Sequence, residues 1–191
     1  MGWALAGRWN SPIAKEIARE ISTISGLYCG PAAVGWIAAV WNNSQGRPYE
    51  YMRRLKDKGL FPNGPRPFRL DLPGFQTNLS DTLRRETNNE LKLAGELYFR
   101  YGAIHNALEK YEMPIIIRML APKLIDGLHY VTLYKSEKQP EQHMRDRIQF
   151  YWQDNGLYES NNGVDAGLTK TDWKKERLKL LFWGAKRVVK V

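Results

Sequence analysis

The sequence predicts a single α+β domain over residues 1–191, with a helical first half and an antiparallel sheet in its second half. Before Pro114, apolar residues recur at helical spacing in segments that begin at serine or proline. From Pro114 onward the segments are short and rich in β-branched and aromatic residues, with charged or glycine-containing turns between them. Helices that precede strands in this way are typical of α+β folds.

The segment 11–21, "SPIAKEIAREI", is the clearest helix of the first half. Ser11 is suited to cap its N-terminus, and Pro12 has the backbone φ angle that a first helical position requires. Isoleucines then follow at every fourth position, which predicts one buried face. Further helices are expected at about 31–42, 48–59, 80–90 and 102–112.

Residues 60–74, "LFPNGPRPFRLDLPG", are expected to form a loop, because prolines and glycines interrupt any regular element. The loop combines arginines with phenylalanines, a mixture that suits a surface lining a substrate groove. These groove candidates are Phe61, Arg66, Phe68 and Arg69. A plain connecting loop is the alternative interpretation.

Strands are expected at 114–120, 128–134, 147–154 and 187–191, with a helix at 168–179 before the last strand. The second of these strands, "LHYVTLY", divides its residues between two faces of the sheet, because successive side chains of a strand alternate. His129, Val131 and Leu133 share one face, and Tyr130, Thr132 and Tyr134 share the other.

Charge and cysteine content limit the class of protein. Lys and Arg number 29 against 20 Asp and Glu, and the net charge of +9 favours acidic partners. One cysteine cannot form an internal disulfide, and with three scattered histidines it makes no conventional zinc site, so no metal or other cofactor is expected. The sequence shows neither a signal peptide nor a transmembrane segment, so we expect a chain that folds in the cytosol, without a membrane partner.

The single cysteine, Cys29, opens an apolar segment at 26–41, "GLYCGPAAVGWIAAVW". Gly30 and Pro31 suit a tight turn into a helix, which would place the thiol at the positive end of the helix dipole. Thiolate is favoured there, and unpaired backbone N–H groups at a helix start can receive an oxyanion. The alternative is an inert cysteine at the start of a buried helix.

A thiolate nucleophile needs a base, and the base needs an orienting partner. His129 opens the strand at 128–134, and Asp154 ends the next strand, so a short hairpin would bring the two together. Cys, His and Asp in this order are a triad constellation. Asn155 is the second candidate for the orienting role. The other histidines have simpler interpretations, with His105 packing within a helix and His143 solvated in a charged hairpin loop.

The stretches "YCGPAAV", "LHYVTLY" and "FYWQDNG" resemble the papain-like cysteine peptidases, most closely the compact bacterial branch that includes bacteriocin-processing peptidase domains. The resemblance covers the chain from Gly26 to about Val191. It implies a helix that begins at the nucleophile and packs on a C-terminal antiparallel sheet. It also implies that Cys29 is the nucleophile, His129 the general base and acid, and Asp154 the residue that orients His129.

Members of this family usually carry a glutamine about six residues before the nucleophile, and its side chain completes the oxyanion hole. This sequence has "STISGLY" at 22–28 instead. The hydroxyls of Ser22, Thr23 and Ser25 are candidate replacements, together with the backbone N–H of Cys29. Gln153 is a weaker candidate, because strand alternation points it away from the side of Asp154.

The chain also looks like the small papain-fold toxins that bacteria deliver to one another by type VI or related secretion. This likeness implies an interbacterial effector that cleaves a cytoplasmic protein of the target cell through a thioester intermediate. The producer would hold it in its cytoplasm and export it without a signal peptide. Its partners would be a protein substrate, acidic or associated with nucleic acid, and an immunity protein that occludes the active site.

Two alternatives use the same fold and chemistry, namely a peptidoglycan amidase effector and a protein deamidase. A third comes from another class, a basic nucleic-acid-binding module, which the +9 charge and the segments "LFPNGPRPFR" and "WKKERLKLLFWGAKR" favour. The basic residues are spread along the chain and no nucleic-acid-binding motif is present. Nucleic acid is therefore not the partner we expect.

Overall fold

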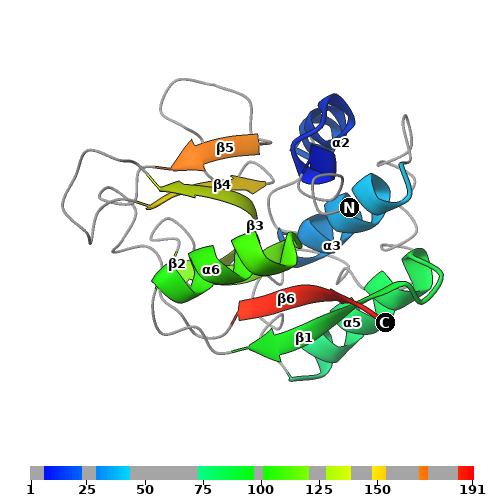
Figure 1. The fold of residues 1–191 in the computed structure, drawn as a ribbon. Coiled ribbons are helices and arrows are strands. Elements are labelled where there is room, and N and C mark those ends of the chain that lie inside the picture. Colours follow the sequence, from blue (N-terminus) through cyan, green and yellow to red (C-terminus); the bar gives the residue numbers. More distant parts are fainter. Residues whose placement is uncertain are drawn as a thin grey trace.

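A computed structural model describes residues 7–22, 29–43, 73–96, 101–120, 128–138, 148–153, 168–171 and 185–191. Within these ranges the chain is a mixture of helices and one antiparallel sheet, which confirms the α+β class (Figure 1). The helices are α2 (Pro12–Ser22), α3 (Cys29–Trp41), α5 (Pro73–Glu86) and α6 (Tyr101–Tyr111). The strands are β1 (Leu91–Glu96), β2 (Ile115–Leu120), β3 (Leu128–Lys138), β4 (Ile148–Gln153), β5 (Leu168–Thr171) and β6 (Ala185–Lys190).

The described strands form a six-stranded sheet in the order β1-β6-β2-β3-β4-β5, and every neighbouring pair is antiparallel. The last strand of the chain, β6, lies between β1 and β2 and pairs with both. The N–H of Val188 also donates to the carbonyl of Pro114 (2.9 Å), just before β2. The C-terminal segment therefore joins the first strand to the rest of the sheet.

Four strands occur where the sequence predicts them, namely β2, β3, β4 and β6. The prediction missed β1, whose six residues "LKLAGE" give only a short alternation and whose partner, β6, lies about 90 residues later. It was also wrong at 168–171, which was expected to begin a helix and instead forms β5. This segment forms a strand because it pairs with the edge of β4, and its two threonines favour a strand. The remainder of that expected helix lies outside the described residues.

The helix α2 confirms its predicted cap, because the hydroxyl oxygen of Ser11 accepts a hydrogen bond from the N–H of Ala14 (3.1 Å). The helices α3 and α6 also occur where expected, and α3 begins two residues earlier than predicted. The helix α5 begins at Pro73, inside the segment expected to be a loop. It ends at Glu86, four residues before the predicted end, because Asn88 and Asn89 turn the chain with positive φ angles. The helix expected at 48–59 lies outside the described residues.

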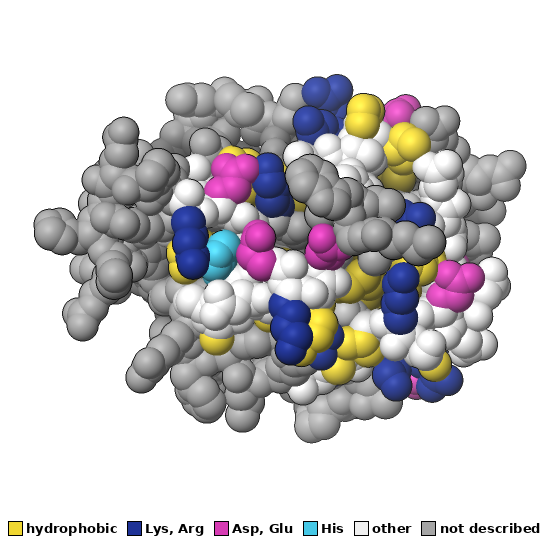
Figure 2. Space-filling view, viewed as in Figure 1, with side chains coloured by type: hydrophobic (Ala, Val, Ile, Leu, Met, Phe, Trp, Pro, Cys, Tyr) yellow, Lys and Arg dark blue, Asp and Glu magenta, His cyan; other side chains and the backbone are white. Residues whose placement is uncertain are grey.

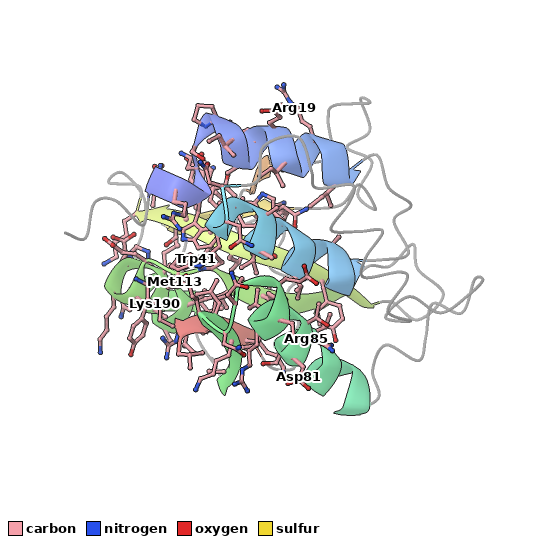
Figure 3. All side chains as sticks on the ribbon, turned by 90° about the vertical axis from the view of Figure 1, so that its right-hand side faces the viewer. Arg19, Trp41, Asp81, Arg85, Met113 and Lys190 are labelled. Atoms are coloured by element: carbon pink, nitrogen blue, oxygen red, sulfur yellow. The ribbon has the colours of Figure 1, made fainter. Side chains whose placement is uncertain are left out.

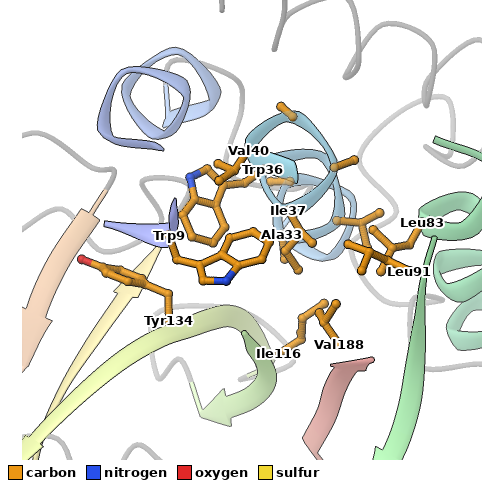
Figure 4. Close-up of a cluster of buried hydrophobic side chains, with 14 of the residues drawn as sticks. Trp9, Ala33, Trp36, Ile37, Val40, Leu83, Leu91, Ile116, Tyr134 and Val188 are labelled. Atoms are coloured by element: carbon orange, nitrogen blue, oxygen red, sulfur yellow. The ribbon is translucent and has the colours of Figure 1, made fainter. Parts of the chain in front are cut away.

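The main hydrophobic core surrounds α3, which is apolar all round and is buried along its length from Ala32 to Val40. The helices α2 and α5 lie beside it, and β3 lies beneath it (Figure 3). Figure 4 shows how Trp9, Trp36 and Ile37 meet between the helices and the sheet. The buried indole N–H of Trp36 donates to the carbonyl of Ala14 (3.0 Å), which ties α3 to α2.

A second core lies on the opposite face of the sheet, beneath α6 (Figure 1). There α6 covers Val131 and Leu133 of β3, whereas Tyr130 and Tyr134 pack in the core around α3. The predicted division of this strand between two faces is therefore confirmed for these residues. No helix in the described part of the chain combines the length and the hydropathy that crossing a membrane requires.

Candidate active site

Cys29 is the first residue of α3, two residues before the predicted start of this helix at Pro31. The helix that follows is buried from its second turn onward, so its position relative to the sheet is fixed by packing on every side. The first N–H groups of a helix have no partner within the helix, and the helix dipole is positive at this end. Cys29 thus occupies a position where both a thiolate and an oxyanion are favoured.

The contacts of α3 define the direction in which it crosses the sheet. At its C-terminal end, the indole N–H of Trp41 donates to a carboxylate oxygen of Glu90 (2.6 Å), and the ammonium of Lys190 lies 5.4 Å from the Trp41 ring. In its middle, the rings of Trp36 and Tyr134 lie 5.7 Å apart. Because 13 residues of helix span about 18 Å, the N-terminus of α3 lies well away from Lys190.

The strand register shows which end of the sheet lies away from Lys190. The end that holds Lys190 is the end where β2 begins, because Arg187 of β6 lies opposite Ile115. The strand β3 runs antiparallel to β2, so it begins at the other end, where Leu128 lies opposite Leu120. The start of β3 therefore lies at the end of the sheet away from Lys190, whereas Tyr134, which the Trp36 ring approaches, lies at the Lys190 end.

The strand β4 ends at the end of the sheet where β3 begins. Its last residue, Gln153, pairs with Thr132, three residues after His129. The expected hairpin geometry is therefore confirmed, because the end of β4 lies beside the first part of β3. Asp154 and Asn155, which follow Gln153 in the sequence, lie outside the described residues.

Position 129 belongs by strand alternation to the face of Val131 and Leu133, which α6 covers, whereas α3 packs on the other face. Position 129 is the second residue of β3, so it lies where the strand begins. A thiol–imidazole contact therefore requires His129 to reach around the end of the sheet toward the start of α3. The Cys29–His129–Asp154 triad stays a prediction.

A cross-strand pair, Thr132 and Gln153, lies near this end on the face that α3 covers. Both side chains are buried, with exposed fractions of 0% and 2%. Neither the hydroxyl oxygen of Thr132 nor the amide nitrogen of Gln153 has a hydrogen-bond partner in the part of the chain that the structure describes. Burying such groups unpaired is costly for stability. The sequence indicated Gln153 only weakly and Thr132 not at all.

His105 has the structural role that the sequence predicts. It is 6% exposed within α6, and its Nδ1 atom lies 2.8 Å from the hydroxyl oxygen of buried Ser136. Burial lowers the pKa of His105; Glu109 opposes this shift and Lys138 adds to it. The neutral imidazole is therefore the favoured form within the fold.

Several predicted site residues lie outside the described part of the chain, so the predictions for them stand as they were made. The helix α2 ends at Ser22, one of the oxyanion candidates. The candidates outside the described residues are Thr23, Ser25, Phe61, Arg66, Phe68 and Arg69, together with His143.

The described side chains contain no group of three or more His, Cys, Asp or Glu that could hold a metal ion. Comparison with protein-family profiles, with curated proteins and with solved structures found no match to this chain.

Proposed function

We propose that this chain is a papain-like cysteine peptidase. One observation supports the proposal above the others: the start of α3, the first part of β3 and the end of β4 belong to elements that pack or pair with one another, since α3 packs on β3 and β4 ends beside the first part of β3. These are the three places at which the sequence puts Cys29, His129 and, directly after β4, Asp154. Residues far apart in the sequence thus come from elements that approach one another.

In the proposed reaction, the Cys29 thiolate attacks the carbonyl carbon of a peptide bond. The Cys29 backbone N–H and the buried Gln153 amide are the donors assigned to the oxyanion. The His129 imidazolium protonates the leaving amine, and a thioester with Cys29 remains. His129 then takes a proton from water, which hydrolyses the thioester and restores the thiolate. Asp154 orients His129 throughout.

Alkylation of the thiol tests the catalytic pair directly, because Cys29 is the only cysteine of the chain. The rate of reaction with iodoacetamide is measured against pH in the wild type, His129→Ala, Asp154→Ala and, as a matched control, His143→Ala. We expect the wild-type thiol and the control to titrate below about 7.5, and the other two variants to return toward the ordinary pKa of about 8.5. An identical pH profile in wild type and His129→Ala would remove His129 from the site.

We further propose that the peptidase is an interbacterial toxin that acts on a cytoplasmic protein of the target cell and is restrained by an immunity protein. Expression of the wild type in the bacterial cytoplasm is expected to stop growth, and Cys29→Ala is expected to be tolerated. New protein termini found by mass spectrometry only with the wild type would identify the substrate. Equal growth with both proteins would contradict the toxin proposal, and digestion of purified sacculi would indicate the amidase instead.

The charge distribution favours the peptidase over a nucleic-acid-binding module. Figure 2 shows basic and acidic side chains interspersed on the face that carries α6, with no continuous basic stripe among the described residues there. Several described cations are engaged with aromatic rings, such as Arg8 over Trp41 and Arg187 over Tyr111. Strong non-specific binding to nucleic acid depends on many cations that contact phosphates together.

A further inference from the structure

A polar pocket of about 320 Å³ lies near the opposite end of β3 from the candidate active site. It opens between the segment before α2, the C-terminal end of α6 and the second half of β3. The residues that matter for its chemistry are Asn10, Glu109, Glu112, Tyr134, Lys135 and Ser136. Tyr134 follows His129 by five residues, or about 17 Å of extended strand. The pocket is therefore separate from the proposed catalytic residues, and its volume is at the lower end of the range for small-molecule sites.

Tyr134 is one of the residues that line this pocket. Its side chain is only 7% exposed, and its ring lies against Trp36 and Tyr151 (centroid distances 5.7 and 6.4 Å). Figure 4 shows the hydroxyl oxygen at the end of the ring that points away from Trp36 and Ile116. None of the described residues forms a hydrogen bond with it. Burial, with a smaller effect from Tyr151, raises the pKa of the Tyr134 phenol, so the hydroxyl stays protonated and can donate.

The pocket carries an excess of negative charge. Glu109 and Glu112 lie at the C-terminal end of α6, where the helix dipole is already negative and carboxylates are unfavourable for stability. The one lysine of the lining, Lys135, forms an ion pair with Glu137. Burial also lowers the pKa of His105, the partner of Ser136, so the imidazole adds no positive charge.

The carboxylate at position 112 is held by a fixed backbone. Glu112 has a φ angle of 52°, in the left-handed region that ends a helix, and its N–H donates to the carbonyl of Leu108 (2.9 Å). Its own carbonyl accepts the indole N–H of Trp9 (3.1 Å), whose ring is fully buried. An acidic residue is thus placed at a fixed corner of the pocket, whose lining also includes Tyr134.

We propose that this pocket binds a small organic cation that carries an alkylammonium or guanidinium group. Glu109 and Glu112 would hold its positive charge, and an acceptor atom next to the charged group would accept a hydrogen bond from the Tyr134 hydroxyl. The group can belong to a free amino acid such as arginine or to a basic side chain of a peptide. This inference does not depend on the peptidase proposal, because it uses none of the proposed catalytic residues.

Isothermal titration calorimetry with arginine, citrulline and glutamate tests the charge preference. We expect arginine to bind at least about tenfold more tightly than citrulline, which has nearly the same shape without the charge, and glutamate not to bind. A blocked peptide, acetyl-Gly-Arg-Gly-amide, distinguishes the two sources: tighter binding than free arginine indicates a peptide ligand, and weaker binding indicates a free amino acid. Equal affinities for arginine and citrulline, or tighter binding of glutamate, would overturn the proposal.

Variants then assign the binding to this pocket. The double variant Glu109→Gln, Glu112→Gln is expected to weaken arginine binding at least about tenfold, and Tyr134→Phe several-fold. Glu16→Gln is the matched control, because Glu16 is an exposed glutamate on α2 that does not line the pocket. Far-ultraviolet circular dichroism checks that each variant is folded. Unchanged arginine affinity in the folded double variant, or no arginine binding to the wild type at millimolar concentration, would refute the site.

Discussion

At the scale of single residues, His105 shows how burial decides the behaviour of an ionisable side chain. The sequence predicts only that His105 packs within a helix. The structure adds a specific partner, the hydroxyl of Ser136 on β3, at 2.8 Å. This contact joins α6 to the sheet through two buried polar groups that satisfy each other, which removes the cost that either would carry alone.

The lowered pKa of His105 makes the stability of the fold dependent on pH. Between its folded pKa and the ordinary value of 6.5, the unfolded chain binds more protons than the folded chain. The free energy of unfolding must therefore decrease as the pH falls below about 6.5. His105→Gln keeps a hydrogen-bonding group but does not titrate, so urea unfolding at pH 7.5 and pH 5.0 should show a smaller loss for the variant than for the wild type. Equal losses would mean that His105 is not buried in its neutral form.

At the scale of elements, the composition of α3 predicts that the helix is buried, because its residues are apolar on all sides. The composition does not predict which elements pack against it. The neighbours in the structure are α2, α5 and β3. The hydrogen bond from Trp36 to the Ala14 carbonyl fixes α3 against α2, because a buried indole N–H must find an acceptor.

Trp36→Phe is expected to reduce the free energy of unfolding by about 2 kcal/mol, because it removes this hydrogen bond and leaves a cavity where the larger ring was. Trp41→Phe is the matched control on the same helix. Trp41 is only half-buried and its indole N–H donates to Glu90 at the surface, so its loss should cost about 1 kcal/mol or less. Denaturant unfolding followed by circular dichroism compares the two. A larger loss for Trp41→Phe would contradict the central position of Trp36.

At the scale of the whole molecule, β6 closes the fold. It lies between β1 and β2, so strands from the two halves of the sequence become one sheet only when the last residues pair. The N–H of Val191 also donates to the carbonyl of Glu90 (3.0 Å), next to β1. Val188 is fully buried in the core around α3, whereas Val189, the next residue, is only half-buried.

Val188→Ala is expected to reduce the free energy of unfolding by about 2 kcal/mol, since it removes buried methyl groups and leaves a cavity. Val189→Ala, on the other face of the same strand, should cost under about 1 kcal/mol. Amide hydrogen exchange should also show weaker protection of β1 in Val188→Ala, because β1 has its described strand partner only in β6. Loss of protection confined to β6 would show that β1 is held by other contacts.

Local patterns of the sequence predicted the elements that have local signals. The cap at Ser11, the helix α6 and the alternation of β3 follow from residues within a few positions of one another, and the structure confirms them. The prediction missed β1, which is short and pairs with a strand about 90 residues later, and it was wrong at β5, a four-residue strand that is stabilised by pairing with β4. For the candidate site, it correctly put Cys29 at a helix start and the end of β4 beside β3.

The sequence by itself determined the α+β class, the buried character of α3 and the residue types that a thiol catalyst needs. These three features depend on composition and on the spacing of residues that are close together in the sequence, and a single sequence contains both. Only the tertiary structure decided that α3 packs between α2, α5 and β3, and that Gln153 is buried without a described partner. It alone also assembled the pocket around Tyr134. The physical reason is that direction, pairing and cavities arise from packing between elements distant in sequence, which local spacing does not encode.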